Sequence, residues 1–320
     1  MFAAYAARFD REQPLNALEL GDRPEPEAPR DWTVVEVRAA TLNHHDLWTL
    51  RGVGIGEEAL PMTLGCDGAG IDADGNEVVI HSVIGATGHG VGPDERRTLL
   101  TEKYQGTFAQ RVAVPKWNLL PKPKELSFEE AACLPTAWLT AYRMLFTNAG
   151  VRPGDSVLVQ GAGGGVATAA IALAAAAGMR VFVTSRDEAK RKRAVELGAT
   201  AAFESGARLP HRVDAVIETV GAATWSHSVK SLRPGGTLVI SGATSGPSPA
   251  SAELNRIFFL ELKVVGSTMG SKEELASLLA FCAATGVRPV IDAVLPLERA
   301  REGFTRMAGG DVFGKIVFNP

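Results

Sequence analysis

The chain has 320 residues, of which 46% are hydrophobic, and this length is enough for two domains with full cores. Its net charge is −3. No long basic run is present, which argues against a nucleic-acid partner held through phosphate contacts. No apolar run approaches the ~20 residues of a membrane span, and charges follow Met1 too early for a signal peptide. Cys66, Cys133 and Cys282 are far apart and odd in number, so we expect a reducing, cytoplasmic setting without a disulfide framework.

The first ~120 residues carry short strand-like runs between turn residues, which is typical of a mostly β domain. The strand candidates are residues 32–37, 77–80 and 108–114.

Two stretches of this region, TLNHHDLWTLRG and PMTLGCDGAG, contain residue types that bind zinc. These are His44, His45, Cys66 and Asp67, but no paired-cysteine spacing accompanies them. The alternatives are histidines bonded to backbone, a small buried cysteine and a turn-capping aspartate. We therefore expect no metal ion.

A helical region leads into the middle of the chain. Ser127 with Glu130 three residues later forms a capping box, which predicts a helix start at Phe128. Pro135 is predicted to end that helix, and a second one is expected over residues 136–148.

The central pattern is strand, glycine turn, helix, strand. A Val-rich run at 156–160 is followed by GAGGG, an Ala-rich helix at 166–177 and a second strand at 181–183. Such a turn lets backbone N–H groups approach a pyrophosphate at the positive end of a helix. A glycine turn without a ligand is the alternative, but the full βαβ context favours a dinucleotide.

The end of the second strand indicates which nicotinamide cofactor binds. An NAD site usually places Asp or Glu there, to accept from the ribose 2′-hydroxyl. Here Ser185 and Arg186 follow the strand, Lys190 comes later, and Asp187 begins the next helix. A hydroxyl and a guanidinium suit a 2′-phosphate, which predicts NADPH. The alternative is a solvated helix start.

Strands and helices continue to alternate, which predicts a doubly wound parallel sheet. A tight turn is expected at 234–236. The remaining helices are expected at 187–197, 225–232, 253–262, 273–284 and 297–307, and the strands at 213–219, 237–241, 263–266, 289–294 and 315–318.

The chain resembles medium-chain dehydrogenases/reductases, in particular the zinc-free, quinone oxidoreductase-like branch. The resemblance rests on the stretches LNHHDLWTLRG, LPMTLGCDGAG, GTFAQRVAVP, AACLPTAWLTAYRML, VLVQGAGGGV, RPGGTLVISG, RPVIDAVLPLERA and FGKIVF. It implies an α/β protein with a Rossmann domain at 122–285. A β-rich, GroES-like catalytic domain would comprise 1–121 and 286–320, with the active site between the two domains.

Departures from the zinc-dependent members are informative. Those members have Cys where this chain has Asn43, and Gly-His-Glu where it has Gly65-Cys66-Asp67. Their structural-zinc loop would fall near 85–103, where this chain has no cysteine. A catalytic zinc is therefore not expected, although His44, Cys66 and Asp67 leave an atypical ligand set as an alternative.

The resemblance also implies the site residues. Without zinc, a developing oxyanion needs hydrogen-bond donors, and the candidates are His44, His45 and Thr140. Trp48 stands where the branch often has tyrosine, and it cannot deliver a proton as a phenol can. The expected cofactor contacts are Asn43, Asp46, Thr140, Ala162, Gly163, Gly164, Gly165, Val166, Ser185, Arg186, Lys190, Val220, Gly221, Ser241, Gly242, Ala243, Ser267, Thr268, Met269, Phe313, Gly314 and Lys315.

The sequence thus predicts an NADPH-dependent oxidoreductase that transfers hydride to a quinone, enone or related conjugated carbonyl, without zinc. The alternatives are a zinc alcohol dehydrogenase with atypical ligands and a non-catalytic NADPH-binding redox sensor. The expected partners are the small-molecule substrate and a second copy of the chain. In the family the strand at 263–266 often pairs across a dimer axis, so a homodimer is predicted.

Overall fold

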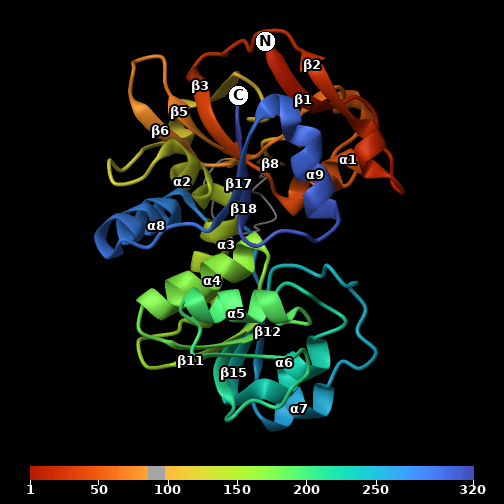
Figure 1. Cartoon of the computed structure of the whole chain (residues 1–320), viewed down its shortest axis with the longest axis vertical. Coiled ribbons are helices and arrows are strands. Elements are labelled where there is room, and N and C mark those ends of the chain that lie inside the picture. The colour runs from red at the N-terminus through yellow and green to blue at the C-terminus, as the bar shows by residue number, and fades with distance from the viewer. Residues whose placement is uncertain (86–97) are drawn as a thin grey trace. The chain divides into compact units, whose positions relative to one another are not determined.

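The structure is a computed structural model that describes residues 1–85 and 98–320 (Figure 1). Its contacts divide the chain into two compact units. Unit 1 comprises Met1–Thr136 and Gly270–Pro320, and unit 2 comprises Ala137–Met269. Unit 2 is therefore an insertion between two parts of unit 1. Residues 86–97, part of the loop in which a structural zinc would fall, lie outside the described residues.

The unit boundaries differ from the predicted ones at 121/122 and 285/286, because two helices belong with the β-rich unit. Helix α2 (Phe128–Ala132) packs against strands β3 and β5 of unit 1. Helix α8 (Lys272–Thr285) follows Gly270, whose carbonyl oxygen lies 2.9 Å from Nε2 of His81 in unit 1.

Unit 1 is built mainly from β-strands. In its described part, a seven-stranded sheet has the order β10-β6-β5-β3-β18-β17, with β9 also pairing β3, and the smaller sheets are β2-β1-β4 and β7-β8. The strands are β1 (Phe2–Ala6), β2 (Leu18–Asp22), β3 (Trp32–Thr41), β4 (Met62–Thr63), β5 (Asp67–Ile71), β6 (Glu77–Ile80), β7 (Val83–Ile84), β8 (Thr98–Leu99), β9 (Arg111–Pro115), β10 (Leu119–Pro121), β17 (Ile291–Pro296) and β18 (Lys315–Asn319).

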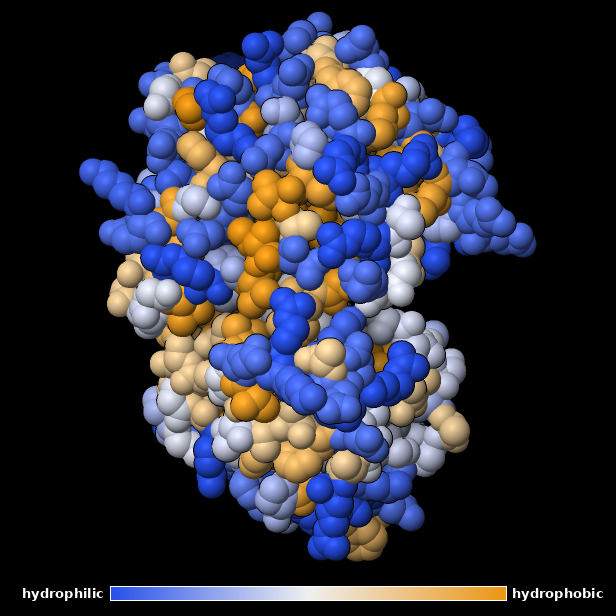
Figure 2. All heavy atoms as spheres, viewed as in Figure 1, coloured by the Kyte–Doolittle hydropathy of each residue, from blue (hydrophilic) through white to orange (hydrophobic). Residues whose placement is uncertain are grey.

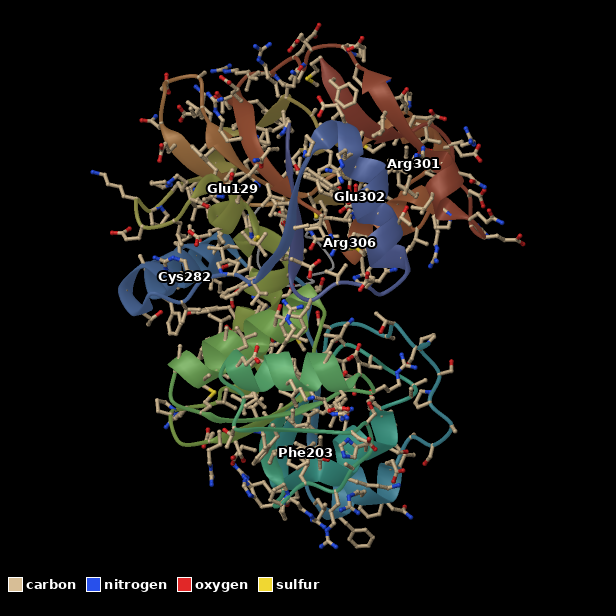
Figure 3. All side chains as sticks on the ribbon, viewed as in Figure 1. Glu129, Phe203, Cys282, Arg301, Glu302 and Arg306 are labelled. Atoms are coloured by element: carbon tan, nitrogen blue, oxygen red, sulfur yellow. The ribbon has the colours of Figure 1, made fainter. Side chains whose placement is uncertain are left out.

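The last strand closes the core of unit 1. β18 runs antiparallel to β3 and parallel to β17. Phe318 on β18 packs edge-on against Phe108, with ring centroids 5.0 Å apart, which is a favourable aromatic geometry. Arg301 of helix α9 (Ala300–Ala308) donates hydrogen bonds to the carbonyls of Leu15 and Leu18 and so connects this helix to the N-terminal segment of unit 1 (Figure 3).

The helical region after β10 is less regular than predicted. The capping box is confirmed, since Glu130 N donates to Ser127 Oγ at 3.1 Å and Ser127 N donates to Glu130 Oε2 at 2.9 Å. Helix α2 ends at Ala132, before Pro135 as predicted, but the second helix does not begin after the proline, because a π-helical segment runs over Leu134–Trp138. The wider π turn leaves room for a ring that clashes with a regular α-helical turn. α3 (Leu139–Tyr142) and a second π-helix (Arg143–Ala149) follow.

Unit 2 is the predicted doubly wound domain. Its six-stranded sheet has the order β13-β12-β11-β14-β15-β16, and the neighbouring strands pair in parallel. Its elements are β11 (Ser156–Gln160), α4 (Gly165–Ala176), β12 (Arg180–Thr184), α5 (Glu188–Glu196), β13 (Ala201–Phe203), β14 (Val213–Glu218), α6 (Trp225–Ser231), β15 (Leu232–Ile240), α7 (Leu254–Phe259) and β16 (Lys263–Gly266).

The predicted turn at 234–236 falls inside β15. The pairing of β15 with β14 jumps from Leu232 to Thr237, so the residues between them stand outside the ladder. The turn residues thus form an irregularity within the strand.

On the face shown in Figure 2, hydrophilic and hydrophobic residues are interspersed. The described residues include no helix long and apolar enough to cross a membrane. All three cysteines are free and buried.

Candidate functional site

The glycine turn of unit 2 leaves space at the start of α4. Gly164 is the N-cap of this 12-residue helix and supplies no side-chain cap. A Cβ built on Gly164 meets nothing within 4 Å, so the space above the helix start is open. Unpaired N–H groups at a helix start attract anions, and the geometry therefore fits the pyrophosphate of a dinucleotide.

The end of β12 presents a cation and no carboxylate. Arg186 is exposed and makes no ion pair or side-chain hydrogen bond with the described part of the chain. The carboxylate of Asp187 caps α5 by accepting from Lys190 N at 3.1 Å. Ser185 is held by Arg191, whose Nη1 donates to the Ser185 carbonyl at 2.7 Å. Arg191 is not among the residues predicted from the sequence, because only its place one helical turn after Asp187 brings it back to the strand end.

Two further loops of unit 2, which follow the neighbouring strands β14 and β15, are joined by hydrogen bonds. Val220 N and Gly221 N donate to Glu218 Oε1 at 2.7 and 3.0 Å. Ser245 N donates to the Val220 carbonyl at 2.7 Å. Gly221 has φ +92°, and a Cβ there would lie 2.7 Å from Ala243 Cα, so only glycine fits. The predicted cofactor contacts Val220, Gly221 and Ala243 therefore lie in two loops that pack against each other.

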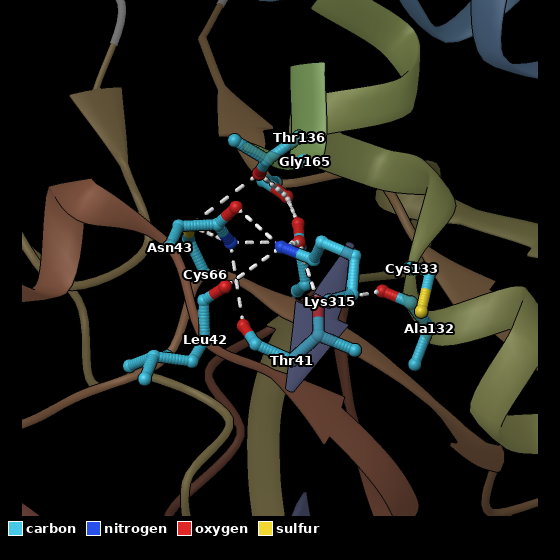
Figure 4. A network of polar contacts seen from close by, with 12 residues as sticks. Thr41, Leu42, Asn43, Cys66, Ala132, Cys133, Thr136, Gly165 and Lys315 are labelled. Carbon is cyan, nitrogen blue, oxygen red and sulfur yellow. Dashed lines mark hydrogen bonds and ion pairs between the residues drawn. The ribbon is translucent and has the colours of Figure 1, made fainter. Parts of the chain in front are cut away.

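In unit 1, a buried ammonium lies within a cluster of polar groups (Figure 4). Lys315 Nζ donates to Leu42 O at 2.8 Å and to Asn43 Oδ1 at 2.6 Å, and it lies 3.5 Å from Asp67 Oδ2. The same carboxylate oxygen accepts from Asn43 Nδ2 at 2.7 Å and from Thr41 Oγ1 at 2.8 Å. The side chains of Lys315 and Asp67 are 2% and 0% exposed, so the two opposite charges compensate each other out of water.

We refer to Thr41, Asn43, Cys66, Asp67 and Lys315 as the buried polar cluster. Cys66 joins it through Asn43 Nδ2 at 3.6 Å. Asn43 and Lys315 are both predicted cofactor contacts, and within unit 1 their polar atoms bind each other and Asp67.

Asp46, another predicted contact, holds the start of helix α1 (His44–Leu50). Its Oδ2 accepts from Asn43 N at 2.8 Å and its Oδ1 accepts from Gly65 N at 2.9 Å. Burial raises the pKa of Asp46 to about 7, although these two backbone hydrogen bonds oppose the shift.

The two histidines of α1 differ in their surroundings. His45 is half-buried, and its Nε2 is buried without a hydrogen-bond partner among the residues described. Burial lowers the pKa of His45, while Glu102 and Asp67 raise it in part. His44 reaches solvent, yet loss of hydration is still the largest cause lowering its pKa, ahead of the charges of Lys315 and Arg51. Both rings are therefore predominantly neutral at pH 7.

The residues around the cluster do not fit a zinc ion. Burial raises the pKa of the Cys66 thiol well above its usual value, and the charges of Asp67 and Asp46 raise it further. Lys315 already supplies a cation to Asp67. Across residues 1–85 and 98–320, no three His, Cys, Asp or Glu side chains form a group that could hold a metal, so His44, Cys66 and Asp67 do not make a ligand set.

The remaining predicted site residues divide between the units. Thr140 and the stretch Ser267–Met269 lie in unit 2, and the stretch 313–315 lies in unit 1. Ser267 Oγ is buried without a partner in the described chain, so it retains an unused polar group. Met269 has φ +50°, an uncommon backbone conformation for a residue other than glycine.

Two family descriptions match the chain. "Alcohol dehydrogenase GroES-like domain" matches residues 29–124, within unit 1, and "Zinc-binding dehydrogenase" matches residues 165–284, mostly within unit 2. Both fit the fold, a β-rich unit and a parallel-sheet unit.

Individual relatives match over most of their length. A zinc-type alcohol dehydrogenase-like protein of Schizosaccharomyces pombe is 31% identical over 314 residues, covering 89% of each chain. An acryloyl-coenzyme A reductase of Sulfurisphaera tokodaii is 28% identical, covering 96% of this chain and 98% of its own. A quinone oxidoreductase of Mus musculus is 28% identical, covering 89% and 88%.

Among solved structures, one described as an NAD-dependent alcohol dehydrogenase is 36% identical, with a TM-score of 0.89 and 100% of both chains covered. The match extends through both units, including the glycine turn that fits a pyrophosphate. The chain therefore belongs to the medium-chain dehydrogenase/reductase superfamily and is an NAD(P)-dependent oxidoreductase.

Proposed function

We propose that this protein reduces a quinone, enone or related conjugated carbonyl with NADPH and without zinc. The observation that carries the proposal is the Lys315 ammonium in the buried polar cluster. There the amide of Asn43 and the carboxylate of Asp67 bind a cation that belongs to the chain. A site organised in this way needs no divalent ion for its own charge balance.

The choice of substrate class follows from the proposed absence of a metal ion that could stabilise negative charge on the substrate. Alcohol oxidation generates an alkoxide, which enzymes commonly stabilise with a metal. A quinone or enone spreads the incoming negative charge over its conjugated system, so neutral hydrogen-bond donors suffice. A bound nicotinamide supplies the hydride. The proposed donors from this chain are the neutral His44 and His45 rings and the Thr140 hydroxyl.

Two relatives support this class. The quinone oxidoreductase of Mus musculus and the acryloyl-coenzyme A reductase of Sulfurisphaera tokodaii are named for conjugated acceptors, and this chain aligns with each over most of its length.

Arg186 supports the choice of NADPH. Arg186 is exposed after the end of β12, and the carboxylate of the next residue, Asp187, is engaged in capping α5. Replacing Arg186→Glu removes a charge-assisted phosphate contact worth ~1.5–3 kcal/mol, which raises the Kd for NADPH by roughly 10- to 100-fold. NADH binding should stay unchanged or improve. Fluorescence titration measures both, with Lys192→Glu as the control, because Lys192 is an exposed cation of the following helix α5, where it pairs with Glu188. Unchanged NADPH affinity in Arg186→Glu would refute the assignment.

The substrate class is tested by an NADPH-oxidation screen with para-quinones, enones, enoyl thioesters and aldehydes, with and without a chelator. We expect turnover of conjugated acceptors that a chelator does not affect, and no stoichiometric zinc by metal analysis. About one zinc per chain, lost together with activity, would instead identify a zinc alcohol dehydrogenase. Tight NADPH binding without any turnover would identify a redox sensor.

A homodimer is also proposed. β16 is an edge strand of the unit 2 sheet, and an unpaired edge is a template for a further strand. The preceding helix α7 exposes three large apolar side chains, Leu254, Phe258 and Phe259. A second copy that pairs along β16 would have these side chains beside the new contact.

A further inference from the structure

Glu218 is a fully buried carboxylate at the carboxyl end of β14. Besides the amides of Val220 and Gly221, it accepts from Thr224 Oγ1 at 2.8 Å and Ser228 Oγ at 2.6 Å. A buried carboxylate is costly unless hydrogen bonds replace its water, and these four donors do so.

The donors of Glu218 belong to a longer polar chain across the sheet. Gln160 Nε2 donates to Ser228 Oγ at 2.9 Å, and Gln160 Oε1 accepts from Thr184 Oγ1. Gln160, Thr184 and Glu218 end the neighbouring strands β11, β12 and β14, and all three are 0% exposed. The glycine turn begins one residue after Gln160, and Ser185 follows Thr184.

We infer that Glu218 is a positioning residue of the dinucleotide site. Its carboxylate holds the amides of Val220 and Gly221 inward, and Gly221 in turn abuts Ala243. In a doubly wound sheet the dinucleotide lies against the carboxyl ends of these strands. The carboxylate of Glu218 therefore orients the loop after β14, and backbone hydrogen bonds such as that from Ser245 N to the Val220 carbonyl join this loop to the one after β15. This inference rests on dinucleotide binding and not on the proposed substrate.

A carboxylate suits this position better than its amide. Glu218 faces donors only, namely two N–H groups and two hydroxyls, and an ionised carboxylate accepts without donating. A glutamine would present two N–H donors of its own. The hydroxyls of Thr224 and Ser228 would have to turn, and Ser228 could no longer hold both Gln160 and residue 218 in the same way.

The test compares two conservative variants on the same strand. Glu218→Gln changes the carboxyl end of β14. Asp214→Asn changes the amino end, where Asp214 Oδ2 likewise accepts from Ser156 N and Ser156 Oγ, each at 2.7 Å. The Kd values for NADPH and NADH are measured by fluorescence titration of the full chain, and folding by circular dichroism and chemical denaturation.

We expect Glu218→Gln to raise both Kd values about tenfold, which corresponds to one poorly satisfied buried group. Asp214→Asn should leave both within twofold. With an acceptor from the screen, Glu218→Gln should raise the KM for the dinucleotide while kcat at saturation changes less than twofold. Equal Kd changes in the two variants, or none in Glu218→Gln, would overturn the inference.

If Glu218→Gln does not fold, Ser228→Ala serves instead, because it removes one donor and keeps the carboxylate. An approximately threefold rise in both Kd values is expected, and no rise would overturn the inference. Because binding is measured without substrate, failure of the proposed carbonyl reduction does not affect the result. The equal effect on NADPH and NADH also separates Glu218 from Arg186, which should affect NADPH alone.

Discussion

The opposite charges of Lys315 and Asp67 offset the free-energy cost of burying each other. A lone charge in a protein interior is strongly destabilising, whereas a hydrogen-bonded pair roughly balances its desolvation. The ammonium also binds the carbonyl before α1 and the amide at its N-cap. The pair therefore both balances charge and holds the start of α1.

Replacing Lys315→Met should lower the free energy of unfolding by ~3–5 kcal/mol at pH 7, because Asp67 is left buried and unpaired. The double variant Lys315→Met/Asp67→Asn should recover most of the loss, since neither charge remains. Urea denaturation measures both. Lys122→Met is the control, because Lys122 is similarly buried but its partner Glu77 is 52% exposed. A loss no larger than that of the control would contradict the charge-balance account.

Asp46 should make stability depend on pH. Its pKa is about 7 in the folded chain, against ~3.9 when unfolded, because burial disfavours the charged form. Between these values the folded state holds a proton that the unfolded state has lost. The contribution of Asp46 to stability is therefore greatest below pH 4, falls as pH rises towards 7 and is constant above.

The variant Asp46→Asn cannot lose that proton, so its stability should fall less steeply than wild type between pH 5 and 7, by up to ~1.4 kcal/mol per pH unit. Urea denaturation at pH 5, 6, 7 and 8 gives the difference. Asp72→Asn is the control and should keep the wild-type slope. Burial alone would raise the pKa of Asp72, but hydrogen bonds from Asn76 and the turn amides lower it below its ordinary value, so this carboxyl does not titrate between pH 5 and 7. Parallel slopes for Asp46→Asn and wild type would show that Asp46 is ionised throughout.

At the scale of elements, α7 and β16 expose large apolar side chains beside the edge of the unit 2 sheet. Phe258 and Phe259 are 60% and 77% exposed, and β16 has one unpaired edge. Single exposed apolar residues are common, but here they follow one another directly before an open sheet edge.

If a second copy covers this region, Phe259→Glu should convert the dimer to a monomer without loss of stability, because the new charge would be buried only in the dimer. Size-exclusion chromatography with light scattering measures the mass. Val195→Glu, at an exposed apolar position of α5, should remain dimeric. A monomeric wild type, or a dimeric Phe259→Glu, would show that this region is not the interface.

Elements with strong local signals could be predicted from the sequence. The bounds of β6, β11 and β16 are those expected, and the Ser127–Glu130 capping box is present. The π-helix through Pro135 could not be predicted, because its wide turn has no local sequence pattern and proline normally indicates a break.

At the scale of the whole molecule, the glycine turn was predictable because the features that define it are contiguous. The buried polar cluster was not, since 272 positions separate Lys315 from Asn43 and only the pairing of β18 with β3 brings them together. Glu218 was missed for a related reason. Its four donors come from a turn and a helix, so an acid at the end of an apolar strand gave no sign of its partners.

The discontinuity of unit 1 has a consequence for synthesis on the ribosome. Unit 2 is one uninterrupted stretch, so its sheet can be completed before the C-terminal part of unit 1 has been translated. Strand β18 lies between β3 and β17, and until it emerges Asp67 lacks its cation. Unit 2 can therefore fold first in the nascent chain, whereas unit 1 is completed only after its C-terminal strands, including Lys315, have been translated.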